Sequence, residues 1–462
     1  MRFTILSHAG LLVETDESVV QETALVVDPW IVGSCYWRSW WNLPEPPRQL
    51  IESLQPTHVY LTHLHWDHFH GPSLRRFSSE THFLVPKFNN DRMRRDLAYL
   101  GFHNVTELDH GERMDLGGLT IQSYQFLNDS AVVITDGEHT ILNANDCKMF
   151  GLPLQQVLGD HASIDFVLRS HSNASAYPYC IEDYETLCPE LRPREAYMDE
   201  FAAFARAVGA RYAIPFASNH CFLHPETRRF NGIAVKPSEV QRRFDAIDVP
   251  GAECVVMAPG SSWTPANGFD LVRFDYDDVD EAIEALAVRH AETIDRQLEA
   301  EAATEFDLKA FETYMQRLVA ATPRPLRKRL GTFEFRVVEH GVERPIAVDG
   351  RTGLVSDGPA SSPTFSVRCQ ALIVNDCTRH DMFSVWTPSK RLSVRVRSRD
   401  QVNTVLLFFS LLDALELDYL PLRRNLDRRM LGSAVRRWRE PVEAIKSGFT
   451  TKVLRRPFRP WS

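Results

Sequence analysis

The sequence predicts an α/β protein with more than one domain. The chain has 462 residues, which is more than one hydrophobic core usually supports, so we expect at least two domains. Short apolar runs typical of buried strands alternate with segments typical of helices through the first 275 residues. One expected strand, residues 58 to 61, runs directly into a stretch that is unusually rich in histidine. We therefore expect a sheet-based fold with polar chemistry at a strand end.

The stretch Thr62 to Gly71 carries four potential metal ligands, His63, His65, Asp67 and His68. Side chains leaving a strand alternate between its two sides, so His63, His65 and Asp67 face one side, and a turn at Asp67 can bring His68 to join them. Imidazole with carboxylate suits zinc, iron or manganese, and the absence of cysteine argues against a closed structural zinc site. Because four ligands within six residues cannot close on one ion without strain, we expect two adjacent ions or one ion with an orienting Asp/His pair.

The pattern His63-x-His65-x-Asp67-His68, after a strand and before an expected helix, resembles the signature of the metallo-β-lactamase fold superfamily. The resemblance implies an αββα sandwich with metal at one edge, but it does not imply a β-lactamase. It also implies a bridging carboxylate after the strand at 140 to 145, where the chain has Asp146; the alternative is an aspartate that begins a turn.

A last metal ligand is expected after the strand at 212 to 216. His220 and His224 both follow that strand, and His220 is favoured. Hydrolases of the superfamily present a further histidine after the strand at 119 to 126, where this chain has Asn128 and Asp129 instead. His8 also resembles a residue near the catalytic edge, although a hairpin histidine bonded to the backbone explains it equally well.

A closer resemblance covers residues 1 to 270, which are similar to the catalytic region of CMP-N-acetylneuraminate hydroxylases. The similar motifs, in chain order, are Ser7–Glu14, Asp28–Trp30, Trp40–Trp41, Glu45–Pro47, His63–His68, Ile141–Asn143, Asp146–Cys147, Ala174–Pro178, Pro215–Ala217 and Trp263–Pro265. Members of that family are iron-dependent monooxygenases of a nucleotide-linked amino sugar and receive electrons through a Rieske domain. This chain has no Rieske ligand set, since Cys377 and His380 form only half of one. The resemblance therefore implies a separate ferredoxin-type electron donor or a different chemistry.

Two enzymatic hypotheses follow. In the first, His63, His65 and Asp146 hold iron as a two-histidine, one-carboxylate set, and Asp67, His68 and His220 complete a second metal site or orient the first. The substrate is then a small molecule such as a nucleotide sugar, and the site holds one or two ions. In the second, zinc lowers the pKa of a bound water toward about 7 for hydrolysis of a phosphodiester or lactone, with Asp67 holding the nucleophile. Asp67 and His68 are the catalytic candidates. A scaffold protein with a structural metal is the third alternative.

The chain divides into four expected regions. Residues 1–275 form the metal-binding catalytic domain, 276–330 a helical linker, 331–422 a small α+β domain and 423–462 a basic tail. The tail has twelve Arg and Lys against three Asp and Glu, so it carries +9, while the rest of the chain carries −18. Its arginines could attract phosphates, an acidic partner or an anionic surface, and nucleic acid is not the expected partner.

Composition indicates a soluble, cytoplasmic protein without a transmembrane segment. The formal net charge is −9 with 44% hydrophobic residues, which fits a globular protein. We expect no signal peptide. The longest apolar run, 405 to 412, is far shorter than the roughly 20 residues of a membrane span. The eight cysteines are scattered and are expected to be buried and reduced.

Overall fold

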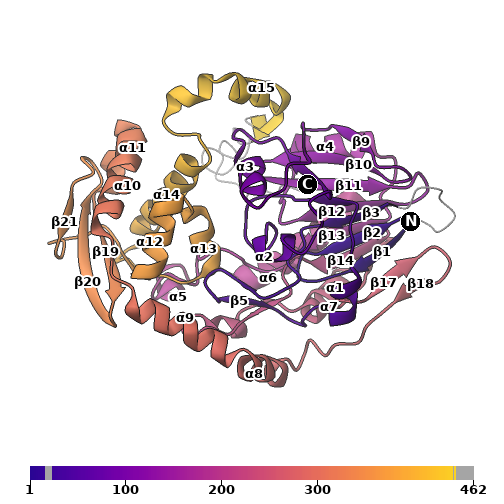
Figure 1. The fold of residues 1–462 in the computed structure, drawn as a ribbon, viewed down its shortest axis with the longest axis horizontal. Helices are drawn as coiled ribbons and strands as arrows, with labels where there is room; N and C mark the ends of the chain where they lie inside the picture. The colour runs from indigo at the N-terminus through magenta and orange to yellow at the C-terminus, as the bar shows by residue number, and fades with distance from the viewer. Residues whose placement is uncertain (16–22, 441, 444–462) are drawn as a thin grey trace.

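Two β-sheets packed face to face form the N-terminal part of the structure (Figure 1). The computed structural model describes residues 1–15, 23–440 and 442–443. The first sheet has the order β18 (Gly268–Asp270), β17 (Ser262–Thr264), β1 (Arg2–Ile5), β2 (Leu11–Glu14), β3 (Ala24–Val27), β6 (His58–Tyr60), β7 (His82–Pro86), β8 (Val105–Leu108). The second has the order β16 (Glu253–Cys254), β14 (Tyr212–Phe216), β13 (Phe166–Ser170), β12 (Thr140–Asn145), β11 (Asp129–Thr135), β10 (Thr120–Phe126), β9 (Arg113–Asp115).

Helices cover the outer face of each sheet. The first sheet is covered by α1 (Arg48–Ser53), α2 (Gly71–Leu74) and α3 (Arg92–Tyr99), and the second by α4 (Gly151–Asp160), α6 (Pro193–Val208) and α7 (Pro237–Ile247). Alternation within the strands explains this layering. Leu11 and Val13 of β2 pack between the sheets, whereas Leu12 packs outward under the helices. The expected αββα sandwich is confirmed.

Parallel strands bring the candidate site residues to one edge. In the first sheet β3 is parallel to β6, and in the second β12, β13 and β14 are parallel. Because the carboxyl ends of parallel strands lie at the same edge of a sheet, the segments after β3, β6 and β12 begin side by side. These segments carry Asp28, the stretch 62–68 and Asp146.

A C-terminal unit packs against this edge. Its sheet has the order β21 (Val355–Asp357), β20 (Val342–Asp349), β19 (Thr332–Glu339), β22 (Ser366–Gln370), β23 (Ser393–Arg395). Its helical elements are α10 (Leu308–Ala321), α11 (Arg324–Leu330), α12 (Ala371–His380), η2 (Phe383–Val385), α13 (Trp386–Ser389), α14 (Arg399–Glu416), η3 (Leu422–Leu426) and α15 (Arg428–Arg436).

The expected linker, 276–330, forms four helices in the structure. α8 (Asp280–Arg289) and α9 (Ala291–Ala303) run along the outside of the molecule, as Figure 1 shows, whereas α10 and α11 pack into the C-terminal unit. The rings of Phe311 in α10 and Phe335 in β19, for example, lie 4.9 Å apart. The second half of the region thus shares its core with the C-terminal sheet.

Residues 30–41, which contain four tryptophans, pack into the same hydrophobic core. They contribute to a small sheet of β4 (Ser34–Cys35), β5 (Trp40–Asn42) and β15 (His220–Phe222), next to η1 (Arg228–Gly232). Trp37 and Trp40 belong to one hydrophobic cluster with Phe335 and Trp386. The C-terminal unit and the site edge are therefore parts of one continuous core. The short helix α5 (Tyr184–Leu187) also packs there, through Tyr184 and Leu187.

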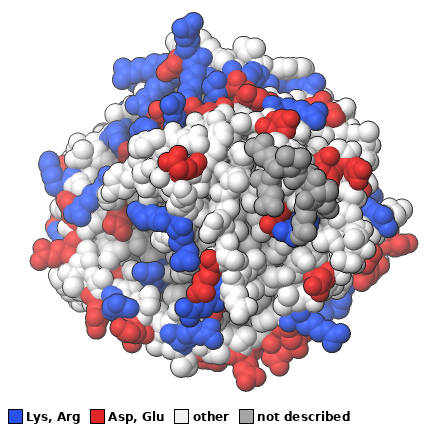
Figure 2. All heavy atoms as spheres, turned by 45° about the vertical axis from the view of Figure 1, so that its right-hand side comes forward, with Lys and Arg blue, Asp and Glu red and all other residues white. Residues whose placement is uncertain are grey.

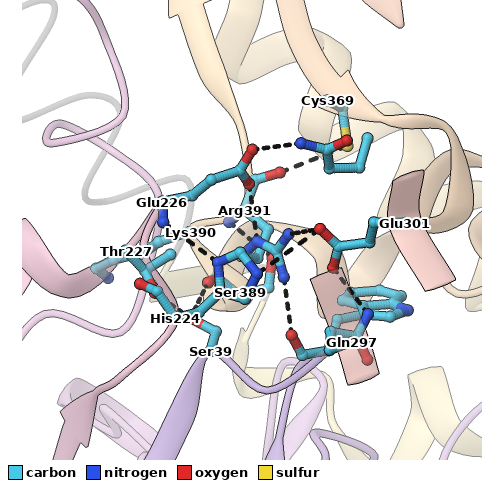
Figure 3. Close-up of polar contacts among 12 residues, drawn as sticks. Ser39, His224, Glu226, Thr227, Gln297, Glu301, Cys369, Ser389, Lys390 and Arg391 are labelled. Carbon is cyan, nitrogen blue, oxygen red and sulfur yellow. Dashed lines mark hydrogen bonds and ion pairs between the residues drawn. The ribbon is translucent and has the colours of Figure 1, made fainter. Parts of the chain in front are cut away.

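A buried ion-pair cluster fixes the two parts to each other (Figure 3). The Arg391 side chain is fully buried and lies between Glu226 and Glu301, with nitrogen–oxygen distances of 2.9 and 2.7 Å. It also donates to the Trp37 carbonyl oxygen at 2.8 Å. Arg391 and its neighbours stabilise Glu301 as a carboxylate: burial opposes ionisation, but His224 and Arg391 lower its pKa to about 2. An arginine of the C-terminal unit is thus enclosed by Glu226 and the Trp37 carbonyl of the sandwich and by Glu301 of α9.

The neighbouring Lys390 is bound to the wall of the site. Its ammonium donates to three successive carbonyl oxygens, those of Asn173, Ala174 and Ser175, at 3.1, 2.6 and 2.9 Å. Burial lowers the Lys390 pKa to about 8, but the three acceptors replace much of the lost water. Lys390 therefore holds the loop at 173–175 in place.

No helix in the described ranges is both long and apolar enough to cross a membrane. All eight cysteines are buried and free of disulfides.

We predict that Arg391→Leu lowers the free energy of unfolding by about 3–5 kcal/mol, because it leaves the buried Glu301 carboxylate without its arginine and removes one of the two arginines paired with Glu226. The matched control is Arg395→Leu, four residues on, where an exposed arginine pairs with Glu182 at 2.7 Å. The control should cost less than about 1 kcal/mol. Chemical denaturation of both variants measures this, and equal losses would contradict a special role for the buried cluster.

Candidate metal centre

The predicted ligands meet at the edge where the strands end. His63 and His65 follow β6, and the Nε2 of His63 lies 2.8 Å from the Nδ1 of His65. Burial, reinforced by the neighbouring His63, lowers the pKa of His65 to about 3, so this imidazole is neutral and has a free lone pair. His63 Nε2 and His65 Nδ1 thus lie next to each other at the end of β6.

The other nitrogen of His63 is held by a carboxylate. Its Nδ1 lies 3.1 Å from the Oδ1 of Asp129, the first residue of β11. Burial acts to lower the pKa of His63, but Asp129 outweighs it and raises that pKa. A carboxylate bonded to Nδ1 fixes the ring and directs Nε2 into the site, as carboxylate partners of metal-bound histidines do.

Asp67 and His68 form the second half of the centre. The Oδ2 of Asp67 lies 3.3 Å from His68 Nε2 and 3.1 Å from His8 Nε2, while its Oδ1 accepts a hydrogen bond from the Tyr36 hydroxyl. Burial opposes the charge on Asp67, but the His68 side chain holds its pKa well below the ordinary value. His8 therefore faces Asp67, although its backbone N–H also donates to Asn42 Oδ1, at 3.0 Å.

Asp28 fixes the orientation of His68. Its Oδ2 lies 2.7 Å from His68 Nδ1 and accepts a hydrogen bond from the Asn145 side chain. The same carboxylate accepts hydrogen bonds from Thr62, at 2.8 Å from the backbone N–H and at 2.6 Å from the hydroxyl group. Asp28 and Asn145 have left-handed φ angles of 46° and 42°, which Asp and Asn tolerate better than most residues. The strand ends are therefore bent so that these side chains converge.

Asp146 completes the centre from the second sheet. Its Oδ2 lies 3.6 Å from His68 Nε2. Two groups of three residues each have ligand atoms within 4.8 Å of one another: His63, His68 and Asp146 form one, and His8, Asp67 and His68 the other. Because His68 belongs to both, the groups are adjacent and form one elongated site.

The residues fit a divalent cation. His68 Nε2 is buried and has no hydrogen-bond partner among the described residues, although it faces two carboxylates. The pKa of Asp146 is lowered despite its burial, chiefly by His68, and Asp67 and Asp28 raise the pKa of His68 above its ordinary value, against the effect of burial. The site thus favours positive charge where nitrogen and oxygen donors converge. One ion or two could be held there by imidazole and carboxylate donors.

The two later histidines lie in different places. His220 stacks on Trp40, with ring centroids 3.6 Å apart, and lies 5.1 Å from the His8 ring. Its Nδ1 is buried without a hydrogen-bond partner among the described residues. His224 instead lies 3.7 Å from Glu301, within the buried ion-pair cluster. His220 is thus beside the centre but outside both groups of three, and His224 contributes to packing between the two parts.

A pocket of about 390 Å³ opens onto His63, His65, Asp129 and Asp146. Its wall includes residues of both parts, with Phe88, Phe126, Leu127, Ala174 and Ser175 from the sandwich and Thr387, Pro388, Asp413, Leu417 and Tyr419 from the C-terminal unit. The C-terminal unit, for which the sequence indicated no chemistry, therefore forms part of the pocket.

Two further ionisable groups that line the pocket are Lys148 and Asp413. Lys148 donates to the Tyr197 hydroxyl at 2.8 Å, and its ammonium lies 4.0 Å from the centre of that ring. It forms no ion pair with any described residue, so it can bind an anionic group of a ligand. Across the pocket, burial raises the pKa of Asp413 to about 8, with a smaller contribution from Glu416, so this carboxyl is protonated at neutral pH.

The sequence did not identify Asp28, Tyr36, Asp129 and Lys148 as site residues. Asp28 could have been found by the signal that identified Asp146, an acidic residue directly after a buried strand. Tyr36 and Lys148 carry no local signal, because their positions depend on how distant segments pack.

We predict that Asp129→Ala weakens metal affinity about 10–100-fold, because His63 loses the partner that orients it. The neighbouring variant Asn128→Ser, at the same hairpin, should leave the affinity unchanged. Competition with a chelator of known affinity measures both. Equal affinity in Asp129→Ala and wild type would show that this carboxylate does not support the centre.

We also predict a pH-dependent effect of Asp413→Asn. The folded protein keeps a proton on Asp413 up to about pH 8, whereas the unfolded chain releases it near pH 4. The unfolded state therefore binds fewer protons between these values, and the free energy of unfolding falls as pH rises from about 4 to about 8. Asp413→Asn removes this loss, so its advantage over wild type should grow with pH across that window.

Denaturation at about pH 5 and about pH 7.5, both inside this window, measures how the free energy of unfolding changes with pH in Asp413→Asn and in wild type. Asp400→Asn, in the first turn of the same helix, is the control and should show the same difference from wild type at both pH values. An advantage of Asp413→Asn that does not change with pH would mean that Asp413 is ionised in the folded protein.

Comparison with known proteins agrees with this architecture. Residues 23–216 match the family model described as the beta-lactamase superfamily domain. A protein of Mycolicibacterium smegmatis named as a Rieske 2Fe-2S iron-sulfur protein is 28% identical over 256 residues, covering 52% of this chain and 48% of that protein. The mouse cytidine monophosphate-N-acetylneuraminic acid hydroxylase is 26% identical over 164 residues, covering 32% of this chain and 26% of the hydroxylase. The chain therefore spans about half the length of the Mycolicibacterium smegmatis protein.

Solved structures with a similar fold include proteins named for different reactions. CmlA, a diiron β-hydroxylase from Streptomyces venezuelae, is 18% identical with a TM-score of 0.38, covering 56% of this chain and 53% of CmlA. An isothiocyanate hydrolase from Delia radicum gut bacteria is 15% identical with a TM-score of 0.42, covering 57% of this chain and 99% of the hydrolase. The resemblance to CMP-N-acetylneuraminate hydroxylases is confirmed by the mouse relative. Residues 23–216 thus match the beta-lactamase superfamily domain, and the two packed sheets with their covering helices have the metallo-β-lactamase fold.

Proposed function

We propose that this protein is an iron-dependent monooxygenase that hydroxylates a small substrate with an anionic group, such as a nucleotide-linked amino sugar. The observation that carries the proposal is the donor set at the inner end of the pocket, where ligand atoms of His63, His68 and Asp146 lie within 4.8 Å of one another and His65 Nδ1 lies 2.8 Å from His63 Nε2. Two histidines and one carboxylate are typical of non-haem iron oxygenases. The similarity to a named hydroxylase supports the same reaction class.

The reaction consumes dioxygen and two electrons. One oxygen atom enters a C–H bond as a hydroxyl group, and the other leaves as water after taking up two protons. Iron held by His63, His65 and Asp146 would supply the redox chemistry that activates dioxygen. The electrons would come from a separate ferredoxin-type protein, and the similarity to a relative named as a Rieske 2Fe-2S iron-sulfur protein supports an iron–sulfur electron donor.

The chain's own residues position the ligands and the substrate. Asp28 and Asp129 accept hydrogen bonds from the far nitrogens of His68 and His63, which keeps the near nitrogens directed into the site. Lys148 and Tyr197 would bind the anionic group of the substrate. Phe88, Leu417 and Pro388 form apolar wall that excludes water. Asp413, protonated at neutral pH, can donate a hydrogen bond to the substrate.

A zinc-dependent hydrolase is the second candidate, and one observation favours it. His8, Asp67 and His68 form a second group of potential ligands beside the first, and adjacent ions are typical of metallo-hydrolases. Asp67 would then hold the attacking water, and the substrate would be a phosphodiester or lactone.

The experiment is metal analysis of protein purified without oxygen, followed by oxygen uptake with a chemical reductant. We expect one or two iron ions per chain and uptake that requires reductant. Asp146→Ala should abolish the uptake, whereas Asp270→Ala, which changes an exposed carboxylate on β18, should not. Two zinc ions per chain, no oxygen uptake and hydrolysis of a phosphodiester would contradict the oxygenase and support the hydrolase.

A further inference from the structure

Exposed apolar side chains are concentrated at one end of the C-terminal unit. Leu422, Leu426, Leu431, Val435 and Trp438 are 58%, 75%, 49%, 74% and 55% exposed. The last three are spaced i, i+4 and i+7 along α15 and the turn after it, so they lie on one side of the helix. We call these five residues, with Arg423, Arg424 and Arg428 beside them, the basic apolar face. Exposed apolar groups gathered in this way usually mark an interaction site.

The opposite side of α15 is fixed to the rim of the pocket. Met430, Ser433 and Arg437 are buried. Arg429 donates to the carbonyl oxygens of Phe88 and Asn90, both at 2.8 Å. The guanidinium of Arg437 donates to the Leu127 carbonyl oxygen. Since Phe88, Asn90 and Leu127 all line the pocket, the basic apolar face points outward next to the pocket entrance.

The charge around this face is positive. Arg423 and Arg428 are exposed, and neither forms an ion pair with any residue in the described part of the chain; Arg424 pairs with Asp418. Figure 2 shows Lys and Arg side chains gathered at the top of the molecule, the end where Figure 1 places α15. The described residues 423–440 and 442–443 contain seven arginines and three acidic residues, a net charge of +4. An anionic surface would therefore attract this end and repel the remainder, which orients the molecule.

We propose that the basic apolar face docks on a membrane surface that contains anionic phospholipid. A helix with Leu, Val and Trp on one side and arginines at its flank is typical of helices that lie in the plane of the lipid interface. The apolar side chains would enter the acyl boundary, and the arginines would contact phosphate groups. An acidic protein would satisfy the arginines but would leave a regular apolar stripe without a matching partner. The bound orientation places the pocket entrance beside the bilayer, and it does not depend on which reaction the site catalyses.

The test is co-sedimentation of the full chain with vesicles of phosphatidylcholine alone or mixed with phosphatidylglycerol. We expect binding only to the mixed vesicles, and weaker binding at high salt. The variant Leu431→Ser, Val435→Ser, Trp438→Ser should lose binding. Arg423→Gln with Arg428→Gln should weaken it about fivefold per arginine. The matched control is Val342→Ser with Leu354→Ser, which changes equally exposed side chains, 69% and 60%, on the distant sheet.

Because the substituted residues are exposed, each variant should keep the circular dichroism spectrum and metal content of wild type. No binding to mixed vesicles would overturn the proposal, and so would binding that the Leu431, Val435 and Trp438 variant retains. Dimerisation through the face without vesicle binding would assign it to a second copy of the chain. Binding only to an acidic ferredoxin would assign it to a protein partner. Either result would overturn the membrane assignment.

Discussion

The carboxylate of Asp28 joins the segments that form the candidate metal centre. It follows β3 of the first sheet, accepts two hydrogen bonds from Thr62 after β6, and accepts another from Asn145 at the end of β12 in the second sheet. It also bonds to His68 Nδ1 at 2.7 Å. Because it is buried, it needs all these donors to offset the loss of water. One side chain thus joins the edges of both sheets and orients the histidine shared by the two ligand groups.

The pocket depends on a second constraint, the packing of the C-terminal unit against this edge. Arg391 is enclosed between Glu226 and Glu301, and Lys390 is bound to three carbonyl oxygens of the pocket wall. Such contacts cost desolvation and are stable only when every charge has its partner. Neighbouring residues of the same unit, Thr387 and Pro388, line the pocket. The sandwich supplies the candidate metal ligands, and the C-terminal unit lines part of the space in front of them.

The sequence was informative where chemistry depends on local order. The alternation of β2 and β3 and the spacing of His63, His65, Asp67 and His68 predicted the layers and the metal edge, because both depend on strand periodicity. The sequence indicated Asp129 only as a residue that stands where a histidine was expected. Its hydrogen bond to His63 could not be predicted, because it depends on how distant strands pack. The sequence also did not predict that Lys390 and Arg391 are buried between the two parts of the structure, because a buried cation is recognised only when its partners are known. The choice between His220 and His224 required the same knowledge, because they lie only four residues apart but face different clusters.

The donor set at this edge is compatible with the proposed oxygenase chemistry. Where a further histidine is expected, the chain places Asp129, which bonds to the outer nitrogen of His63. The inner nitrogens of His63 and His65 then share the edge with carboxylates rather than with a third imidazole from that hairpin. A donor set of this kind leaves positions open for small molecules.

The most direct test of this account is anomalous diffraction at the iron edge from crystals of iron-loaded protein. The account predicts a peak enclosed by His63 Nε2, His65 Nδ1 and the Asp146 carboxylate, and allows a second beside Asp67 and His68. The absence of any peak at this edge, or iron bound only elsewhere, would contradict it.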